Sequence, residues 1–316
     1  MNNKKDLEAI QQLNQKKTLI YTVAFSADNN YAAPLGVAIK SLLNTISSDF
    51  FCDIVILDSG ISKRNKFLLR TLTNHIEFAS IRFYDVTNIF SDAPVWGYYS
   101  KAVYTQLLVP YIFRNFDMVL VLDCDIILQD DISSLFETKF SNELVAAVRD
   151  VGIPILVRDD HKLVFKEEFI SWRHYINFYL HYDKDEINDI INSGVLLFNI
   201  SSFREDDFLA LQEVEELIKF GYFLVDQCIS NILFKKRIIY LPMRWNLLVQ
   251  EDRIEKLDGD FPTEYLEAEK NPAIIHYIID RKPWKKHLVL YESEFWNVAQ
   301  ETPWFTELQD NLICSD

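Results

Sequence analysis

The chain has 316 residues, of which 49% are hydrophobic and 25% are charged, a composition typical of a folded globular protein. Its formal net charge of −15 argues against nucleic acid as a partner, because phosphate backbones are bound by clustered Lys and Arg side chains. The same charge disfavours an anionic membrane surface. A chain of this charge can still bind a phosphorylated small molecule if a divalent cation offsets the phosphate charge. Clusters of carboxylates that could hold such a cation are therefore the features to look for.

The cysteines and the N-terminus indicate a reducing compartment. The four cysteines are widely separated and lack a CxxC pairing, so the sequence indicates neither a zinc site nor a disulfide framework; they are Cys52, Cys124, Cys228 and Cys314. Residues 1–17 are polar, and no later stretch approaches the roughly 18 apolar residues of a membrane span. We therefore expect a cytoplasmic protein without a transmembrane segment, with peripheral contact at the inner face of the membrane as the alternative.

From Thr18 onward, short apolar runs alternate with longer helical patterns, which predicts an α/β fold with a mainly parallel sheet. Helices are expected from residue 31, at 63–74 behind the N-cap Ser62, and at 101–113. The acidic stretch 251–270 is expected at the surface. The expected strands are residues 18–25, 51–58, 76–86, 118–122, 144–148, 195–200, 237–241 and 273–278.

The pattern divides the chain into one main domain and two short flanking segments. Residues 1–17 form an N-terminal helical extension, residues 18–284 the α/β domain, and residues 285–316 a C-terminal segment. That segment is expected to dock on the body through aromatic side chains, with Trp284 beside its start and Phe295, Trp296 and Trp304 within it.

The strongest local signal is Asp123-Cys124-Asp125, directly after the apolar run MVLVL. Carboxylates at positions i and i+2 of extended backbone project to the same side, and the carboxyl ends of strands are where open α/β sheets bind ligands. Two oxygen ligands in this arrangement suit a Mg²⁺ or Mn²⁺ ion that bridges a diphosphate. The alternative is that two aspartates merely begin a loop.

His276 interrupts another apolar run, AIIHYII, and Lys282 follows it closely. If His276 joins Asp123 and Asp125, the resulting ligand set suits Mn²⁺ better than Mg²⁺. Lys282 could then meet a phosphate oxygen. The alternatives are a buried histidine bonded to backbone and a solvated surface lysine.

Six segments, in this order, resemble the bacterial family 8 retaining glycosyltransferases, which include lipopolysaccharide galactosyl- and glucosyltransferases and the glycogenins. They are SADNNYAAPLGVAIKSLL, VLVLDCDIIL, NSGVLLFNI, DQCISNILF, RWN and HYIIDRKPWKK. The likeness runs from about Thr18 to Trp284. It implies a GT-A type fold, with a Rossmann-like, mainly parallel sheet flanked by helices and a small C-terminal appendage. It also implies retaining, Mn²⁺-dependent transfer of a hexose from UDP-glucose or UDP-galactose to a glycan, lipid-linked or protein acceptor.

The resemblance also implies roles for individual residues. Asp123, Asp125 and His276 match the family's metal ligands. Asp150, Asp226 and Gln227 match catalytic positions around the transferred sugar. Residues that match the donor-binding positions include Asp28 for the uracil edge, Tyr31 for stacking on the base and Lys282 for the diphosphate; the full set is Ala27, Asp28, Asn30, Tyr31, Asp123, Asn192, Ser193 and Lys282.

For the retaining step, Gln227 is a poor nucleophile and Asp226 is an unproven one. We therefore favour same-face attack, with the donor phosphate as base.

Two positions depart from the family pattern. Gln106 stands where the family usually has an arginine, and Ile279 stands where it usually has a glycine. These departures keep open a non-catalytic nucleotide-sugar binding protein. A haloacid-dehalogenase-like phosphatase is a further alternative, but its DxD normally follows the first strand of the domain, whereas Asp123 follows several predicted strands. Neither the acceptor nor the oligomeric state follows from the sequence.

Overall fold

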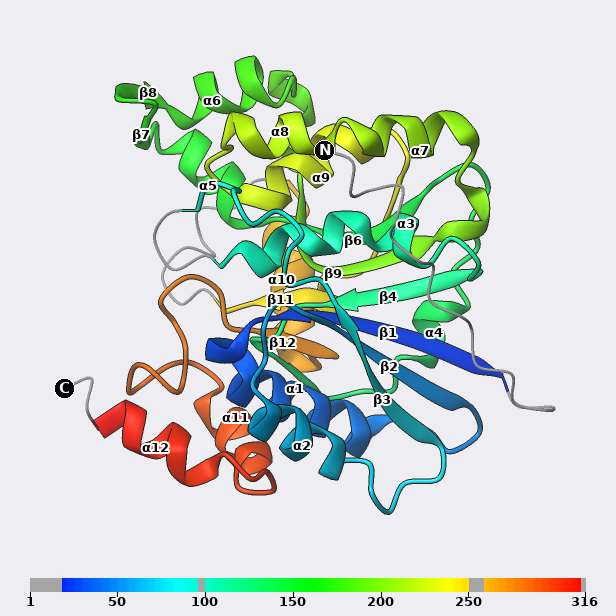
Figure 1. Ribbon diagram of the computed structural model, residues 1–316. Coiled ribbons are helices and arrows are strands. Elements are labelled where there is room, and N and C mark those ends of the chain that lie inside the picture. The colour runs from blue at the N-terminus through cyan, green and yellow to red at the C-terminus, as the bar shows by residue number, and fades with distance from the viewer. Residues whose placement is uncertain (1–18, 96–99, 250–258, 314–316) are drawn as a thin grey trace.

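The computed structural model describes residues 19–95, 100–249 and 259–313 (Figure 1). The predicted N-terminal extension and Cys314 lie outside the described residues, as does most of the first half of the acidic stretch 251–270. The other cysteines, Cys52, Cys124 and Cys228, are buried free thiols, as the sequence indicates.

The centre of the molecule is a seven-stranded sheet with the order β10-β6-β9-β4-β1-β2-β3. All of its neighbouring pairs are parallel except those of β9, which runs antiparallel to both β4 and β6. The strands are β1 Ile20–Ala27, β2 Phe51–Asp58, β3 Ala79–Asp85, β4 Met118–Leu122, β6 Val145–Arg149, β9 Ile191–Asn199 and β10 Ile238–Tyr240. Strands β2 and β9 are buried along their whole length, which fits the apolar sequences expected at the centre of such a sheet.

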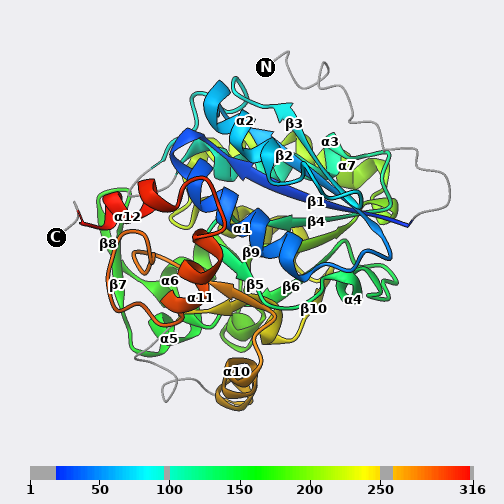
Figure 2. The same ribbon diagram turned by 90° about the horizontal axis from the view of Figure 1, so that it is seen from below.

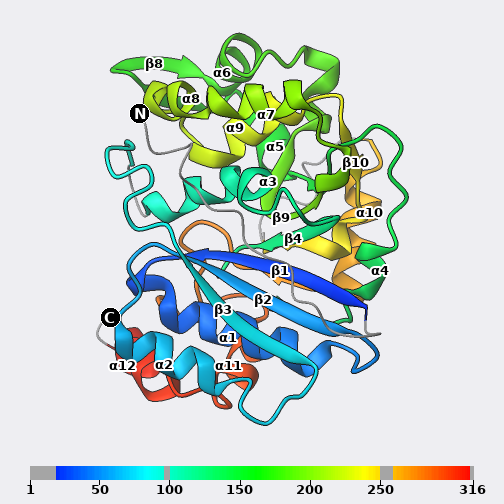
Figure 3. The same ribbon diagram turned by 45° about the vertical axis from the view of Figure 1, so that its right-hand side comes forward.

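Helices cover both faces of the sheet, so that the core has two layers (Figures 1 and 3). One face carries α1 Ala32–Thr45, α2 Lys63–Thr71, α11 Glu292–Ala299 and α12 Phe305–Ile313. The other carries α3 Val109–Ile112, α6 Trp172–Tyr179, α7 Glu205–Gln212, α8 Val214–Phe220 and α9 Val225–Phe234.

A second, three-stranded sheet has the order β11-β12-β5 and lies beside the main one (Figure 2). Its strands are β11 Leu247–Leu248, β12 Ile274–His276 and β5 Ile126–Leu128. The remaining elements are the 3₁₀ helices η2 Asn29–Tyr31, η3 Lys101–Leu108, η4 Lys184–Asp189, η5 Ile200–Ser202 and η6 Met243–Asn246, the helices α4 Ser133–Phe136, α5 Gly152–Arg158 and α10 Phe261–Lys270, and the hairpin of β7 Lys162–Phe165 and β8 Glu168–Ser171.

The local predictions are confirmed where the sequence carries a strong signal. Strands β2 and β4 have the predicted bounds, and the Ser62 hydroxyl accepts the Asn65 amide at 3.2 Å, which caps α2. The helix predicted at 101–113 instead forms η3 followed by a single turn, α3. Pro110 lacks the N–H that would bond the Gln106 carbonyl in a continuous α-helix.

Other features were not predicted. Strands β5, β7 and β8 are three or four residues long and carry too little pattern to be recognised. Helix α10, which makes up most of the described part of 251–270, lies at the surface as expected and packs on the body through one face, formed by Phe261, Tyr265 and Ala268. Among the described helices, none combines the length and apolarity that a membrane crossing requires.

The C-terminal segment packs on α1 through Trp304, which is fully buried. Its indole lies against Gly36 so closely that a Cβ at position 36 would come within 2.3 Å of the Trp304 ring. Trp304 also donates from Nε1 to Oδ1 of Asn65 on α2, at 3.1 Å. The domain boundary at residue 284 stays a prediction.

We predict that Gly36→Ala destabilises the protein, although alanine is the better helix former by about 1 kcal/mol. The added methyl would overpack Trp304, which typically costs about 1–3 kcal/mol. Urea unfolding in a double-mutant cycle checks this. In the Trp304→Ala background, where the ring is gone, the same Gly36→Ala change should become stabilising, and destabilisation of equal size in both backgrounds would contradict the contact.

Candidate active site

The predicted site residues meet at one edge of the main sheet. Ala27, Asp123 and Asp150 end or follow the parallel strands β1, β4 and β6, whose carboxyl ends share that edge. Strand β9 runs the other way, so Asn192 and Ser193 at its beginning lie there too. Together these residues line a pocket of about 460 Å³, which is large enough for a small-molecule ligand.

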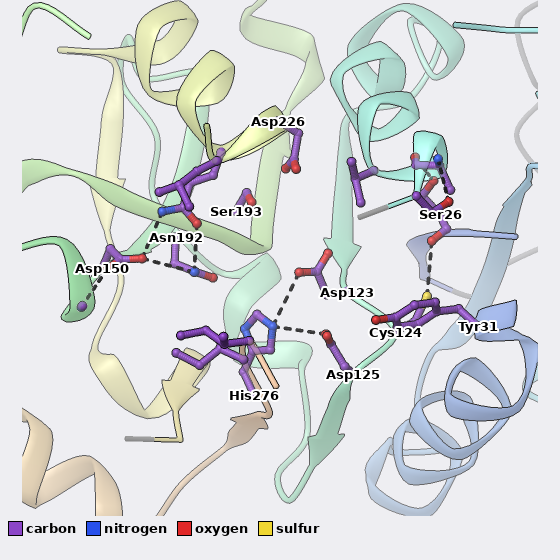
Figure 4. Close-up of a pocket in the computed structure, with 18 of the residues that line it drawn as sticks. Ser26, Tyr31, Asp123, Cys124, Asp125, Asp150, Asn192, Ser193, Asp226 and His276 are labelled. Carbon is purple, nitrogen blue, oxygen red and sulfur yellow. Dashed lines mark hydrogen bonds and ion pairs between the residues drawn. The ribbon is translucent and has the colours of Figure 1, made fainter. Parts of the chain in front are cut away.

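Asp123, Asp125 and His276 form a compact cluster in this pocket (Figure 4). One ligand atom from each lies within 4.8 Å of the others. Nε2 of His276 is 3.2 Å from Oδ1 of Asp125 and 3.6 Å from Oδ2 of Asp123. The sequence predicted this convergence, and the structure brings the side chains together as candidate metal ligands.

The second sheet explains how residues so far apart in the chain meet. Strand β12 pairs antiparallel with β5, and the register places His276 opposite Ile126, next to Asp125. The Tyr277 amide then donates to the Asp125 carbonyl at 3.0 Å. On the other side, the Asp123 amide donates to the Gly194 carbonyl at 2.9 Å, which ties the first aspartate to β9.

Lys282 is also part of this cluster, because its ammonium group is buried and donates to Oδ2 of Asp125 and to the Tyr277 carbonyl. Burial alone would raise the pKa of Asp125, but Lys282 and His276 outweigh that effect and hold the pKa below its usual range. Burial and the neighbouring Asp125 raise the pKa of Asp123. One ammonium therefore faces two carboxylates, and the cluster keeps an excess of negative charge.

Tyr31, which is predicted to stack on the base, lies across the pocket from Asp150 and Asn192 (Figure 4). Oδ1 of Asp28 accepts the amides of Asn30 and Tyr31 at 2.9 and 3.2 Å, and so shapes the loop after β1. Asp28 and Tyr31 line the pocket and also an adjoining cavity of about 440 Å³, which Asn30 borders. The pocket thus has two walls, with the metal-ligand cluster between them.

The opposite wall is a hydrogen-bonded set of Asp150, Asn192 and Gln227. Oδ2 of Asp150 accepts from Nδ2 of Asn192 at 3.3 Å and from Nε2 of Gln227 at 3.0 Å. Asn192 also donates to Oε1 of Gln227 at 3.0 Å. These side chains hold one another in place, and they come from the residue after β6, from β9 and from α9.

Asp226 lies in the first turn of α9, next to Gln227, and is buried. Burial, assisted by the charge of Asp123, raises its pKa to about 7, against the opposing effect of hydrogen bonds from Ser193 and Gln106. Gln106 stands where the family usually has an arginine, and it donates to Asp226 from a neutral amide. An arginine there would lower the pKa of Asp226 further than this amide does.

Ile279, the second departure, has a backbone φ of +57° and lines the pocket while half exposed. This is the left-handed region, which glycine adopts freely and a β-branched residue adopts at a cost. The conformation that suits the family's glycine is thus kept here under strain.

Two residues that contact His276 were not singled out from the sequence. Gly194 leaves room for the ring, since a Cβ there would come within 2.3 Å of Cε1 of His276. Asn246 of η6 lies beside the ring, with Oδ1 2.9 Å from Nδ1. Both belong to quoted segments, NSG and RWN, but only the three-dimensional contacts show what they do.

The sequence profile of Glycosyl transferase family 8 matches residues 22–287. The chain belongs to this family. It is 27% identical over 310 residues to General stress protein A of Bacillus subtilis (strain 168), and the match covers 92% of this chain and 97% of that protein. It is 23% identical over 294 residues to Lipopolysaccharide 1,2-glucosyltransferase of Escherichia coli K12, with 89% and 78% covered. It is 26% identical over 223 residues to the Probable glycosyl transferase Gly of Streptococcus gordonii. That match covers 69% of this chain but only 27% of the other protein.

Solved structures agree in fold. The chain superposes on the bifunctional glycosyltransferase WbbM with a TM-score of 0.82 at 24% identity, over 97% of this chain and 54% of that one. It superposes on the galactosyltransferase LgtC, solved with donor and acceptor sugar analogues, with a TM-score of 0.71 at 25% identity, over 89% and 96%. The predicted GT-A fold is confirmed, and the protein is a glycosyltransferase. The phosphatase alternative is wrong, since the DxD follows the central strand β4 of this fold.

We predict that Gly194→Ala weakens the binding of a divalent cation at this cluster, with Mn²⁺ as the probe, by about 10-fold or more, because the new methyl must displace the His276 ring. Isothermal titration of Mn²⁺ measures the effect. Gly36→Ala is the matched control: it also crowds an aromatic ring, but remote from the pocket, so it should leave Mn²⁺ affinity unchanged. Equal affinities for Gly194→Ala and wild type would contradict the role of Gly194.

Because the pKa of Asp226 is raised, we predict that the difference in stability between wild type and Asp226→Asn changes with pH. The carboxyl binds its proton more tightly in the folded protein than in the unfolded chain, where its pKa is about 4. Folding therefore takes up a proton between about pH 4 and 7, and stability falls across that range as pH rises. In the presence of EDTA, Asp226→Asn should be more stable than wild type at pH 8, on the order of 2 kcal/mol, and the gain should shrink toward pH 4. A gain that does not change with pH would exclude this carboxyl as its source.

Proposed function

We propose that this glycosyltransferase transfers a hexose, glucose or galactose, from its UDP-sugar to a carbohydrate acceptor with retention of configuration, using Mn²⁺ held by Asp123, Asp125 and His276. The observation that carries the proposal is the convergence of these three side chains between the two walls of one pocket. The donor-binding and sugar-facing residues that the family resemblance implies line the same pocket or the adjoining cavity.

The cluster fits a divalent cation in its chemistry. Two carboxylates and one imidazole form a mixed oxygen and nitrogen set, which suits Mn²⁺ better than Mg²⁺, the alternative ion. Oδ1 of Asp125 is buried and has no hydrogen-bond partner of good geometry among the described residues, so an acceptor lone pair is available to a cation. When bound, the cation would offset the negative charge that develops as the diphosphate leaves.

Lys282 supplies the second positive charge. Its ammonium contacts Asp125, and a cation bound at the cluster would compete for that carboxylate. Released from part of this attraction, Lys282 can donate to a diphosphate oxygen at the edge of the pocket. This pairing explains how an acidic chain accommodates an anionic donor: the positive charge is concentrated at one buried point.

The second wall is suited to the sugar. Asp150, Asn192 and Gln227 present carboxylate and amide groups that are already fixed by mutual hydrogen bonds. Such groups bind hydroxyls without an ordering cost at the moment of binding. We assign them, with Ser193, to the hexose. Ala27, Asp28, Asn30 and Tyr31 on the opposite side are assigned to the uridine.

The environment of Asp226 supports same-face attack rather than a covalent intermediate. A nucleophilic carboxylate must be ionised and free, but Asp226 is buried, accepts from Gln106 and has its pKa raised to about 7. Gln227 is held at both ends of its amide and is a poor nucleophile. The donor phosphate is then the base for the incoming hydroxyl.

We further propose a cytoplasmic location and a glycan, lipid-linked or protein-linked acceptor.

The decisive experiment measures UDP release from UDP-glucose and UDP-galactose with Mn²⁺, with and without a panel of carbohydrate acceptors. We expect turnover that EDTA abolishes. Asp125→Asn should lower it about 100-fold or more, because a cation of this kind contributes several kcal/mol. Asp49→Asn, an exposed aspartate on the connection before β2, is the matched control and should behave as wild type.

The outcomes separate the proposal from its alternative. Mn²⁺-dependent UDP binding without turnover on any acceptor would contradict the proposed reaction and would indicate that the departures at Gln106 and Ile279 have left a nucleotide-sugar binding protein of this family. Absence of both UDP and Mn²⁺ binding would overturn the metal assignment itself.

A further inference from the structure

Asn246 connects the metal-ligand cluster to the sugar-facing wall. It is buried at the end of η6, just before β11. Its Oδ1 lies 2.9 Å from Nδ1 of His276, and its Nδ2 donates to Oδ1 of Asn192 at 2.8 Å. A continuous hydrogen-bonded chain therefore runs from His276 through Asn246 and Asn192 to Asp150.

The direction of this chain is set at the Asn192 end. The Gly194 backbone N–H donates to Oδ1 of Asn192 at 2.9 Å, and a backbone N–H can only donate. On its other side, Nδ2 of Asn192 donates to the Asp150 carboxylate, whose Oδ1 accepts the amides of Gly152 and Ile153 at 2.8 Å each. A fixed donor and a fixed acceptor thus determine which way the Asn192 amide points.

That orientation passes to His276. Because Oδ1 of Asn192 is an acceptor, Asn246 must present its NH₂ group to it, and its own oxygen then faces Nδ1 of His276. Nδ1 must therefore carry a hydrogen. We propose that Asn246 is a positioning residue which fixes the tautomer of His276, keeping the proton on Nδ1 so that Nε2 faces Asp123 and Asp125 as the metal ligand.

The alternative tautomer cannot be accommodated by local flips. A lone pair on Nδ1 would face the Asn246 oxygen, and both groups are buried. Flipping Asn246 would set two oxygens against each other at Asn192. Flipping Asn192 in turn would set its NH₂ against the Gly194 N–H and its oxygen against Asp150. Each flip moves the mismatch along the chain without removing it.

The same chain joins two parts of the site. Asn192 contacts both Asp150 and Gln227, so the groups assigned to the hexose and the imidazole assigned to the cation share one hydrogen-bond network. Partners that orient a metal-bound histidine in this way typically change metal affinity 10–100-fold when removed. This inference rests on the metal site proposed above.

The first test compares Mn²⁺ affinity among variants at position 246. Asn246→Ala should weaken Mn²⁺ binding about 10–100-fold. Asn246→Asp should stay within about threefold of wild type, because a carboxylate oxygen still accepts the Nδ1 proton. That variant cannot donate to Asn192, so its UDP-glucose affinity should fall relative to its UDP affinity. Asn199→Ala removes another buried asparagine, at the far end of β9, and should leave Mn²⁺ affinity unchanged.

The second test reads the tautomer directly. In metal-free protein with ¹⁵N-labelled histidine, Nδ1 of His276 should carry a directly bonded proton whether the ring is neutral or charged, with His276→Gln used to assign the signal. In Asn246→Ala, that proton should exchange faster. Asn246→Asp, which keeps the acceptor, should preserve the slow exchange even if Asn246→Ala folds poorly.

Several results would overturn the inference. They are a lone pair on Nδ1 in the wild type, or wild-type Mn²⁺ affinity in a folded Asn246→Ala protein. A wild-type protein that binds no Mn²⁺ would remove the metal site and this inference with it. Normal Mn²⁺ binding by both wild type and Asn246→Ala would remove only the inference.

Discussion

The pairing of β12 with β5 is the constraint on which the site depends. Only because His276 is held opposite Ile126 does an imidazole from the last part of the domain reach two aspartates that follow its central strand. Strand β9 provides the matching constraint on the other side, since its reversed direction returns Asn192, Ser193 and Gly194 to the edge where the parallel strands end.

Charge is distributed in this fold so that an acidic protein can hold an acidic ligand. The net charge of −15 belongs to the chain as a whole, whereas the pocket places one buried ammonium among its carboxylates. Buried charges of opposite sign are costly to separate and strongly coupled, so changes at Asp125 are felt at Lys282 and at His276. Gln106 donates a hydrogen bond from its neutral amide to the Asp226 carboxyl, so it satisfies this buried group without adding a charge.

Much of the fold could be predicted from the sequence, and the reasons are local. MVLVL is a fully apolar run bounded by aspartates, so β4 was placed to the residue. Strand β9 was placed too late, at 195, because Asn192 and Ser193 are polar. They are in the strand since their side chains face the pocket rather than the core. The strand predicted at 273–278 contains β12, whereas β5 was missed, because it forms by pairing with β12 and three residues carry too little periodicity to be recognised.

The sequence predicted which residues form the candidate site, but not the contacts that connect them. Asp123 and Asp125 stood out because they follow an apolar run and His276 because it interrupts one, and the family resemblance brought the three together. The contacts of Gly194 and Asn246 with His276 depend on the positions of single atoms in the folded chain. Spacing along the sequence does not give those positions.

The seating of Trp304 on Gly36 has a consequence for how the protein is made. The first helix of the domain obtains its full packing only from a residue near the end of the sequence. During synthesis on the ribosome, the surface of α1 that Trp304 covers must therefore stay exposed to solvent until residue 304 has emerged. The strands β1 and β2 can pair early, but the helical layer packed on them is completed only after Trp304 has been made.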